Sequence, residues 1–385
     1  MAQERRPGPE GRAPSPSGRH HAEHPHGHSL YEAEEFLDAP PEERIPAQEV
    51  SLARRFGSLR TIGSLLFALV LVFLLFRYVL GVDLGETWRR ITQADVGLLV
   101  VAFIAYYLTF PLRGLRWRLL LARGGCHVPF VQATEILYLS WFVNCVVPAK
   151  LGDLYRAYLL RENYGASVSR TVGSIFIERI ADIVVIFGLA LAAGYWSFRG
   201  RERPEVDALF LAGFVFAGLL VAVVVGLRFW GRAVASRLPA RLEEFYERFH
   251  QGSVGVLEPR TTAVVVVLTG LIWMAEAFRF FFVVRALGLP DVGLGISASV
   301  FAALAASLLT AIPLTPAGIG FVEAGIVGVL ALYGVDAQSA TAVALTDRAI
   351  SILSVLVLGG LLYVFSGMVR RAHGVGAAPA DSTSG

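Results

Sequence analysis

An unbroken apolar stretch at residues 208–227 limits what this chain can fold into. The stretch spans twenty positions without one charged residue, and residues 61–76 form a second uncharged run. A helix needs about 20 apolar residues to cross a hydrocarbon core of ~30 Å. Because lipid offers no hydrogen-bond partners to the backbone, a segment of this kind must be helical. With 55% hydrophobic and only 17% charged residues in the whole chain, the sequence predicts an all-α, polytopic helical membrane bundle.

About eight hydrophobic segments can be distinguished between the polar ends of the chain. They lie near residues 61–80, 96–112, 131–148, 171–197, 207–228, 261–288, 294–333 and 340–367. The third segment contains Asn144 and Pro148, and the seventh contains Pro313 and Pro316. Irregular backbone at membrane depth is tolerated only where it is buried in protein or lines a cavity. We therefore expect these two segments to be broken or re-entrant helices.

Arginine-rich flanks set the expected orientation. Basic clusters precede the first segment, occupy the loop at 229–260 and follow the last segment. Cytoplasmic loops carry an excess of basic residues, so we expect this loop and both termini to be cytoplasmic, in the cytoplasmic (plasma) membrane. Basic residues also flank both sides of the third segment. A re-entrant segment explains this pattern, because it returns the chain to the side from which it came.

The polar parts of the chain divide it further. Residues 1–57 have the composition of a disordered tail, residues 58–368 form the transmembrane domain, and residues 369–385 form a second tail. Five histidines at 20–28 can hold a metal weakly, but the composition favours a plain low-complexity tail. Within the loop at 229–260, aromatic and leucine residues at helical spacing indicate an amphipathic helix on the membrane surface or against the bundle. No internal repeat is apparent from residue identity.

Charged residues inside the apolar segments are the candidates for function. Each costs about 2.5–3.5 kcal/mol at the centre of a span, so such residues face a bundle interior or a wet cavity. Five places in the chain contain them. Together with the helix-breaking positions beside them, the candidate site residues are Arg113, Arg116, Asn144, Lys150, Asp153, Arg156, Glu178, Arg179, Asp182, Glu276, Arg279, Gly318, Gly320, Glu323, Asp347 and Arg348.

The basic positions have a functional and a structural interpretation. Arg113 and Arg116 share a helix face and can bind a lipid phosphate through paired donors, or they form an ordinary positive cluster at the end of a span. Lys150, Asp153 and Arg156 lie three apart and line one helix face. They follow a helix break of the kind that marks substrate sites in transporters; an interfacial loop with a surface ion pair is the alternative.

Two of the acidic places allow the same two interpretations. Glu178 and Asp182 lie four apart on one helix face, with Arg179 beside them. Their expected partners are the basic residues of the preceding segments, either to join helices or to take part in transport. Glu276 and Arg279 lie three apart and can pair locally, which lowers the cost of inserting them.

The seventh segment gives the strongest transporter-like pattern. Gly318 and Gly320 let the backbone approach a head group, and a half-helix starting there points its N-terminal dipole at an anion. Glu323 follows this break. In the eighth segment, Asp347 and Arg348 can offer a complementary charge pair.

Signatures of enzymes and cofactor sites do not occur in the sequence. There is no HExxH, no GxSxG, no phosphate-binding loop and no paired-cysteine ligand set. Cys126 and Cys145 have neither a metal spacing nor the pattern of a disulfide framework. We expect no enzyme activity, no cofactor, no metal and no nucleic-acid partner.

Taken in chain order, the motifs resemble the flippase-like family of the lysylphosphatidylglycerol synthase transmembrane domain. The resemblance covers about residues 60–367 and rests on LRGLRWRLLL, N-x3-P-x3-GD-x2-R, ER-x2-D, PAGIGFVEAG and the late Asp347-Arg348. It implies a bundle of about eight membrane segments that moves a phospholipid or similar lipid between leaflets, with the matched charged residues along the head-group path. Ala317 stands where the family often has a second glycine. No transferase domain follows the last segment, so synthesis of aminoacylated lipid is not expected.

The leading hypothesis is a translocator of an anionic or aminoacylated phospholipid or of a polyprenyl-linked lipid. In it, the basic groups hold phosphate, the acidic groups balance charge or take a cationic head group, and segments three and seven gate the path. A second hypothesis is a non-transporting accessory subunit of a membrane glycosyltransferase or lipid-modifying enzyme. A third is a membrane enzyme acting on a lipid head group. A lipid-sized cavity among the charges favours the first, and a dry core with fully paired charges favours the second.

Overall fold

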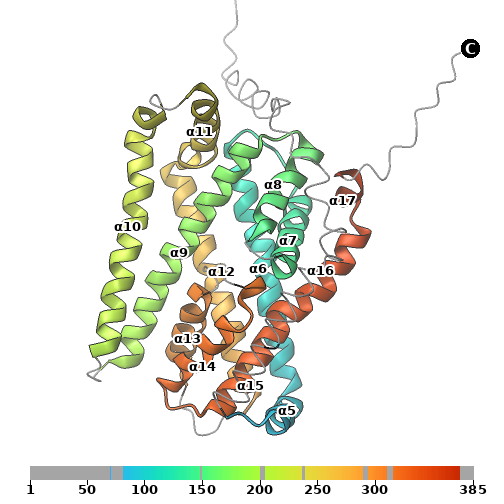
Figure 1. Cartoon of the computed structure of the whole chain (residues 1–385), viewed down its shortest axis with the longest axis vertical. Coiled ribbons are helices and arrows are strands. Elements are labelled where there is room, and N and C mark those ends of the chain that lie inside the picture. The colour runs from blue at the N-terminus through green and yellow to red at the C-terminus, as the bar shows by residue number, and fades with distance from the viewer. Residues whose placement is uncertain are drawn as a thin grey trace, which may run out of the picture.

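The computed structural model describes residues 70, 81–147, 150–199, 204–235, 239–288, 294–309 and 315–372. Every regular element in these ranges is a helix (Figure 1), which confirms the expected all-α architecture. The first hydrophobic segment lies outside the described residues apart from Val70. The N-terminal tail, its histidines and the last thirteen residues also lie outside them.

Long helices run the length of the bundle. They are α6 (Val96–Arg123), α9 (Val168–Phe198), α10 (Pro204–Ala235) and α12 (Pro259–Ala286), together with the continuous run of α15 (Ala337–Arg348), the π-helical turn η5 (Ala349–Leu353) and α16 (Ser354–Phe365). Within the described residues, four segments are long and apolar enough to cross a membrane: Val96–Arg123, Gly213–Trp230, Pro259–Ala286 and Ala337–Phe365. Helix α9 is as long, but Glu178, Arg179 and Asp182 interrupt its apolar sequence.

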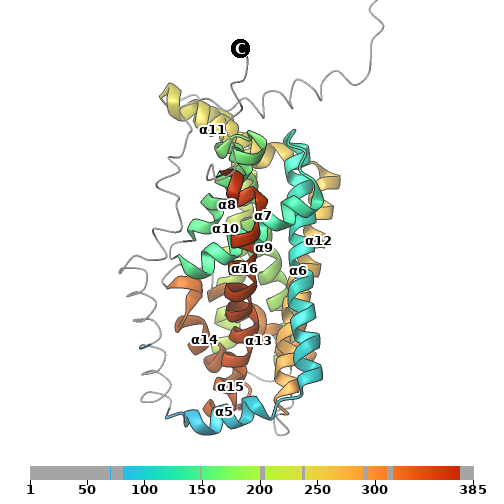
Figure 2. The same cartoon turned by 90° about the vertical axis from the view of Figure 1, so that its right-hand side faces the viewer.

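Two helical hairpins occupy opposite halves of the bundle. One consists of α7 (Phe130–Val146) and α8 (Leu151–Tyr164), and the other of α13 (Ile296–Leu309) and α14 (Phe321–Ala331). The first lies in the upper half and the second in the lower half in both views (Figures 1 and 2). Each hairpin therefore enters from one end and turns near mid-height. The expectation that segments three and seven are broken or re-entrant is confirmed.

Helices α6 and α12 pack side by side in opposite directions. The Asp95 amide at the start of α6 donates to the Ala286 carbonyl at the end of α12, over 2.8 Å. At the other end, Arg123 lies 2.8 Å from Glu258. Each helix thus leads into one of the hairpins from the opposite end of the molecule.

Each hairpin has its own hydrophobic core. The first packs against the second half of α6 and against α16, with Trp117 and Leu139 fully buried. The second packs against α9 and α12, with Ala302 and Leu330 fully buried. The bundle is therefore two packed lobes, and the charged residues are gathered where the hairpin tips approach each other.

Short helices cap both ends. They are α5 (Leu84–Thr92), α11 (Ala240–Gly252), η3 (Val254–Val256) and α17 (Gly367–Ala372), whereas the short helix η4 (Pro316–Gly318) lies at the tip of the second hairpin. The expected amphipathic helix is α11: Leu242 and Phe245 are exposed, whereas the Phe249 ring packs 5.4 Å from that of Phe176 on α9. Helices α11 and α17 lie at the same end of the molecule (Figures 1 and 2).

The second tail begins later than expected. Residues 369–372 continue α17, in which Met368, Val369 and Ala372 are buried. The Tyr158 hydroxyl also donates to the Ala372 carbonyl over 2.7 Å. These contacts extend the packed domain to residue 372, because three apolar side chains return to α8.

Candidate functional site

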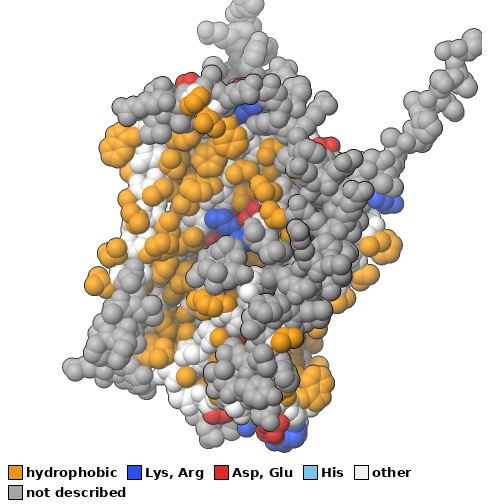
Figure 3. Space-filling model, in the orientation of Figure 1, with side chains coloured by type: hydrophobic (Ala, Val, Ile, Leu, Met, Phe, Trp, Pro, Cys, Tyr) orange, Lys and Arg blue, Asp and Glu red, His pale blue; other side chains and the backbone are white. Residues whose placement is uncertain are grey.

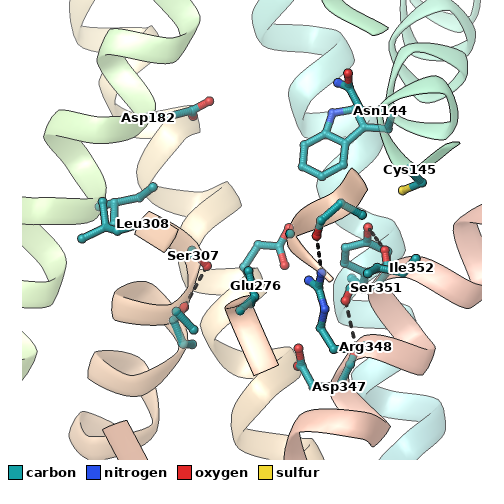
Figure 4. Close-up of a pocket in the computed structure, with 18 of the residues that line it drawn as sticks. Asn144, Cys145, Asp182, Glu276, Ser307, Leu308, Asp347, Arg348, Ser351 and Ile352 are labelled. Atoms are coloured by element: carbon teal, nitrogen blue, oxygen red, sulfur yellow. Dashed lines mark hydrogen bonds between the residues drawn. The ribbon is translucent and has the colours of Figure 1, made fainter. Parts of the chain in front are cut away.

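A cavity of about 420 Å³ lies between the tips of the two hairpins. This volume is within the range of small-molecule sites, roughly 300–1,000 Å³. Eleven of the sixteen candidate residues line it: Arg113, Asn144, Lys150, Asp153, Arg179, Asp182, Glu276, Arg279, Gly318, Asp347 and Arg348. Glu276 points into the space between Asp182 and Arg348 (Figure 4). Residues from six α-helices and from the short helix η4 (Pro316–Gly318) thus meet at one place.

The other five candidates lie behind the cavity wall: Arg116, Arg156, Glu178, Gly320 and Glu323. Aromatic residues that the sequence did not single out also line the cavity, among them Tyr106, Trp141 and Trp273. An aromatic residue in an apolar helix gives no sequence signal that separates a cavity wall from a lipid-facing or packed position.

An ion-pair network joins α6, α8 and α9. Glu178 accepts from Arg116 on α6 at 3.2 Å and from Arg156 on α8 at 2.7 Å. Asp182 lies 2.6 Å from Arg116 and also accepts from the Trp273 indole at 3.0 Å. The expected pairing of Glu178 and Asp182 with basic residues is therefore present, and it is buried.

A second network joins α12, α14 and α15. Arg279 pairs with Asp347, and Arg348 lies 2.9 Å from Glu323. Arg348 also donates to the Ala317 carbonyl at the tip of the second hairpin. Asp347 and Arg348 therefore do not form a pair with each other. Consecutive helical side chains point in different directions, so each reaches a different helix.

Glu276 joins the second network to α6. It lies 3.2 Å from Arg279 on its own helix and 3.2 Å from Arg113 on α6. The Arg113 guanidinium also lies over the Trp141 and Trp273 rings, 4.7 Å and 5.2 Å from their centres. Arg113 is only 2% exposed, so ion pairing and ring contacts replace its lost hydration.

The row of Lys150, Asp153 and Arg156 does not act as one unit. Arg156 is buried against Glu178 and stacks 3.7 Å over the Trp117 ring. Asp153 accepts three hydrogen bonds from Arg179 on α9, over 2.7, 3.0 and 3.2 Å. Among the described residues, Lys150 has no ion-pair partner. Only Lys150 and Asp153 of the row reach the cavity.

Strained backbone marks both hairpin tips. Lys150 has φ 53° and Ala317 has φ 51°, which are left-handed values uncommon outside glycine. After the first tip, the Asn144 side chain accepts from the Gly152 amide over 2.8 Å. After the second, the Glu323 side chain accepts from the Gly320 amide over 2.6 Å. The anion expected at the N-terminus of this half-helix is thus the protein's own Glu323.

The two halves repeat a short sequence pattern. Residues 148–152 read PAKLG and residues 316–320 read PAGIG. In each half an acid-arginine dipeptide follows, 178–179 and 347–348, and an arginine precedes on the long helix, at 116 and 279. This repeat escapes a comparison of residue identities along the chain because so few positions carry it.

The contacts of the two halves repeat as well. The acid of each dipeptide pairs with the arginine of the preceding long helix: Glu178 with Arg116, and Asp347 with Arg279. The arginine of each dipeptide pairs with an acid on the second helix of the hairpin. These pairs are Arg179 with Asp153, and Arg348 with Glu323. With hairpins entering from opposite ends, this is the arrangement of an inverted repeat.

Charged side chains reach the outer surface at mid-height. Lys or Arg and Asp or Glu atoms are visible in the middle of a mainly apolar face (Figure 3). The Arg179 and Asp153 side chains are 33% and 20% exposed, whereas those of Glu178 and Arg156 are 2% and 4% exposed. The charges between α8 and α9 therefore become more exposed from the pair of Arg156 and Glu178 to the pair of Asp153 and Arg179, which borders the cavity.

Comparison with known proteins gives a consistent set of relatives. The profile of the family described as lysylphosphatidylglycerol synthase TM region matches residues 61–359. A UPF0104 membrane protein of Methanocaldococcus jannaschii is 34% identical over 222 residues, which cover 58% of this chain and 93% of that protein. A UPF0104 membrane protein of Methanothermobacter thermautotrophicus is 25% identical over 294 residues, covering 71% of this chain and 84% of that protein. A Haloferax volcanii protein named glycosyltransferase AglD is 28% identical over 323 residues, covering 73% of this chain and 51% of that protein.

Proposed function

The chain belongs to the lysylphosphatidylglycerol synthase transmembrane-region family, and from that premise we propose that it is a lipid translocator. A lipid head group enters the charged cavity between the hairpins, while its hydrocarbon chains stay in the surrounding lipid. The protein acts in the cytoplasmic membrane, with α11 and the C-terminal end on the cytoplasmic side. It moves its lipid without changing it chemically.

The observation that carries this proposal is the position of the cavity. It lies between two opposed hairpin tips and is lined by nine charged residues of both signs. Intramembrane charges mark substrate paths, and broken helices meeting at mid-depth are typical of transporter sites. Charges kept only to join helices do not require a space between them.

We assign the gating movement to the two hairpins. Arg179 on α9 pairs with Asp153 of the first hairpin, and Arg348 on α15 pairs with Glu323 of the second. The buried pair of Arg156 with Glu178 also holds the first hairpin. A head-group phosphate can compete for either arginine, because it offers the same acceptor geometry as a carboxylate. Loosening one hairpin opens the cavity toward one end. The inverted arrangement makes the other hairpin its counterpart at the opposite end.

A second candidate function is that of an accessory subunit. Among the described residues, each arginine and each acid of the two networks has an ion-pair partner, which suits a structural role. One relative is also named a glycosyltransferase. In that case a membrane enzyme of the same cell binds this chain, and the purified chain moves no lipid.

Filling the cavity tests the translocator proposal without removing a charge. Ser307 lines the cavity on α13, and Ser307→Trp places a large side chain in the head-group path. We expect leaflet exchange of fluorescent lipids in proteoliposomes to fall nearly to the rate of protein-free vesicles. The reason is that a tryptophan occupies a substantial part of a cavity of about 420 Å³.

Val266→Trp is the matched control. Val266 lies on the outer side of α12 and is 48% exposed, so a tryptophan there faces lipid and exchange should stay at the wild-type rate. If Ser307→Trp folds and exchanges lipid as fast as Val266→Trp, the cavity is not the path. If the wild type exchanges no lipid class at all, the accessory-subunit function replaces the translocator.

A further inference from the structure

Resting on the proposed translocator function, we propose that Lys150 binds the phosphate of the transported lipid. The head group accepted by the cavity is a phosphodiester with one net negative charge. Two sources supply that chemistry, an anionic glycerophospholipid and a polyprenol joined to a sugar through a single phosphate.

Basic side chains outnumber acidic ones at the cavity. Among the described residues, the wall and the ion pairs behind it hold seven basic and six acidic side chains. The basic ones are Arg113, Arg116, Lys150, Arg156, Arg179, Arg279 and Arg348, and the acidic ones are Asp153, Glu178, Asp182, Glu276, Glu323 and Asp347. Every arginine and every acid in this set has an ion-pair partner. One positive charge is therefore in excess, and it is that of Lys150.

An excess charge at membrane depth is costly unless a counter-charge compensates it. A phosphodiester monoanion makes the site neutral. A diphosphate adds at least one negative charge too many, and an aminoacylated lipid brings another cation. The charge balance thus selects one class among the lipids that a cavity of this size admits.

The backbone at Lys150 has a left-handed conformation. Its φ of 53° and ψ of 36° lie in the left-handed region, where glycine is unstrained and a residue with a side chain is not. The equivalent residue of the second hairpin is Gly318, with φ 71°. Strained backbone of this kind is concentrated at functional sites. A lysine at a position that favours glycine therefore indicates a functional role for its side chain.

The basic residue at position 150 is a lysine and not an arginine. Lys150 is the sole lysine in a chain of 34 basic residues. Arginine binds phosphate through a rigid fork of paired donors, whereas lysine binds it as a single mobile charge. A transported group must be bound strongly enough to enter and weakly enough to leave. Lysine meets that requirement better than the paired arginines around it.

The cavity offers a cationic head group neither a free tryptophan ring nor an unpaired acid among the described residues. Arg113 already lies over the Trp141 and Trp273 rings, so it competes for the aromatic faces that bind ammonium groups. The acids of the wall are paired with arginines. A cationic head group therefore has to displace an arginine, while an anionic one finds Lys150 accessible.

The test compares three Lys150 variants in proteoliposomes of phosphatidylcholine. The labelled probes are phosphatidylglycerol, a glycosyl-phosphoryl-polyprenol, a polyprenyl diphosphate and phosphatidylcholine. We expect wild type to move at least one of the two phosphodiester monoanions faster than the other two probes, and the faster monoanion identifies the source. Lys150→Gln should slow that lipid roughly tenfold or more, since a charge-assisted contact is lost. Lys150→Arg should keep a larger share of the rate.

Lys150→Gly separates binding from folding. It removes the side chain together with the backbone strain, so it should unfold at the same or a higher temperature than wild type while moving the monoanion as slowly as Lys150→Gln. A wild type that moves phosphatidylcholine as fast as the monoanions, or a Lys150→Gly protein with undiminished monoanion exchange, overturns this inference and leaves the translocator intact. A folded wild type that moves none of the four probes overturns both.

Discussion

Replacing Glu178 with glutamine is expected to destabilise the protein by about 3–5 kcal/mol, the usual cost of removing one partner of a buried ion pair. Glu178 is 2% exposed and holds Arg116 and Arg156 together. Arg116 keeps Asp182 as a partner after the change, but among the residues that the structure describes Arg156 keeps only the face of Trp117. The substitution preserves the shape of the side chain, so the loss reports the uncompensated charge of Arg156.

Thermal and denaturant unfolding in detergent measures this loss. Glu86→Gln is the matched control, because Glu86 forms an exposed pair with Arg89 and Arg90 at the edge of the bundle. Hydrogen bonds from these two arginines lower the pKa of Glu86 to about 2. Glu86 is therefore ionised in ordinary buffers, and its loss still should not shift the midpoint measurably.

A second substitution identifies the cause. Adding Arg156→Met to Glu178→Gln removes the cation that has lost its partner, and the double variant should regain part of the lost stability. A double variant no more stable than Glu178→Gln alone would show that the loss comes from packing or from Arg116.

The location of the site could be predicted from the sequence, because charge inside an apolar helix is costly wherever it occurs. Arg113, Glu276 and Asp347 lie more than seventy positions apart from each other, yet the cost of inserting each of them predicts a shared interior. The helix breaks predicted the two hairpins for a related reason. Proline and glycine leave backbone groups that only protein or a cavity can satisfy.

Which of those charges are buried in ion pairs and which line the cavity could not be predicted. Arg156 and Lys150 lie six positions apart on the same hairpin, but the first is buried against Glu178 and the second borders the cavity. That difference depends on where α9 crosses α8, which is a tertiary relation without a local sequence signal. Trp141 and Trp273 line the cavity because of how α7 and α12 are rotated about their axes, which is likewise a tertiary relation.

The inverted relation of the two halves explains why similar motifs have unequal roles. Both hairpins turn through a left-handed residue and then begin a helix, but Asn144 caps the first and Glu323 the second. An amide is neutral, so the first tip can present a cation to the cavity. A carboxylate paired with Arg348 closes the second tip on itself. If the chain is a translocator as proposed, this asymmetry assigns the ligand-binding charge to the first hairpin.

Replacing Gly152 with alanine is expected to move the tip of that hairpin and abolish lipid exchange. A Cβ atom at Gly152 would lie 2.1 Å from the Ser140 carbonyl oxygen and 2.6 Å from the Asn144 side-chain oxygen. The first of these is backbone of α7 and cannot turn aside, so α7 and α8 have to separate. Overpacking of this kind costs about 1–3 kcal/mol. It also removes the contact between Asn144 and the Gly152 amide, on which the position of Lys150 depends.

Gly270→Ala is the matched control within the same bundle, because a Cβ atom there meets nothing within 4 Å. This variant should unfold at or slightly above the wild-type temperature, as alanine favours helix over glycine, and should exchange lipid at the wild-type rate. The decisive comparison is between the two alanine variants in the proteoliposome assay at a temperature where both remain folded. Equal exchange rates would mean that α7 and α8 can separate at the tip without cost to transport. A selective loss in Gly152→Ala would tie transport to the tight crossing that holds Lys150 at the cavity.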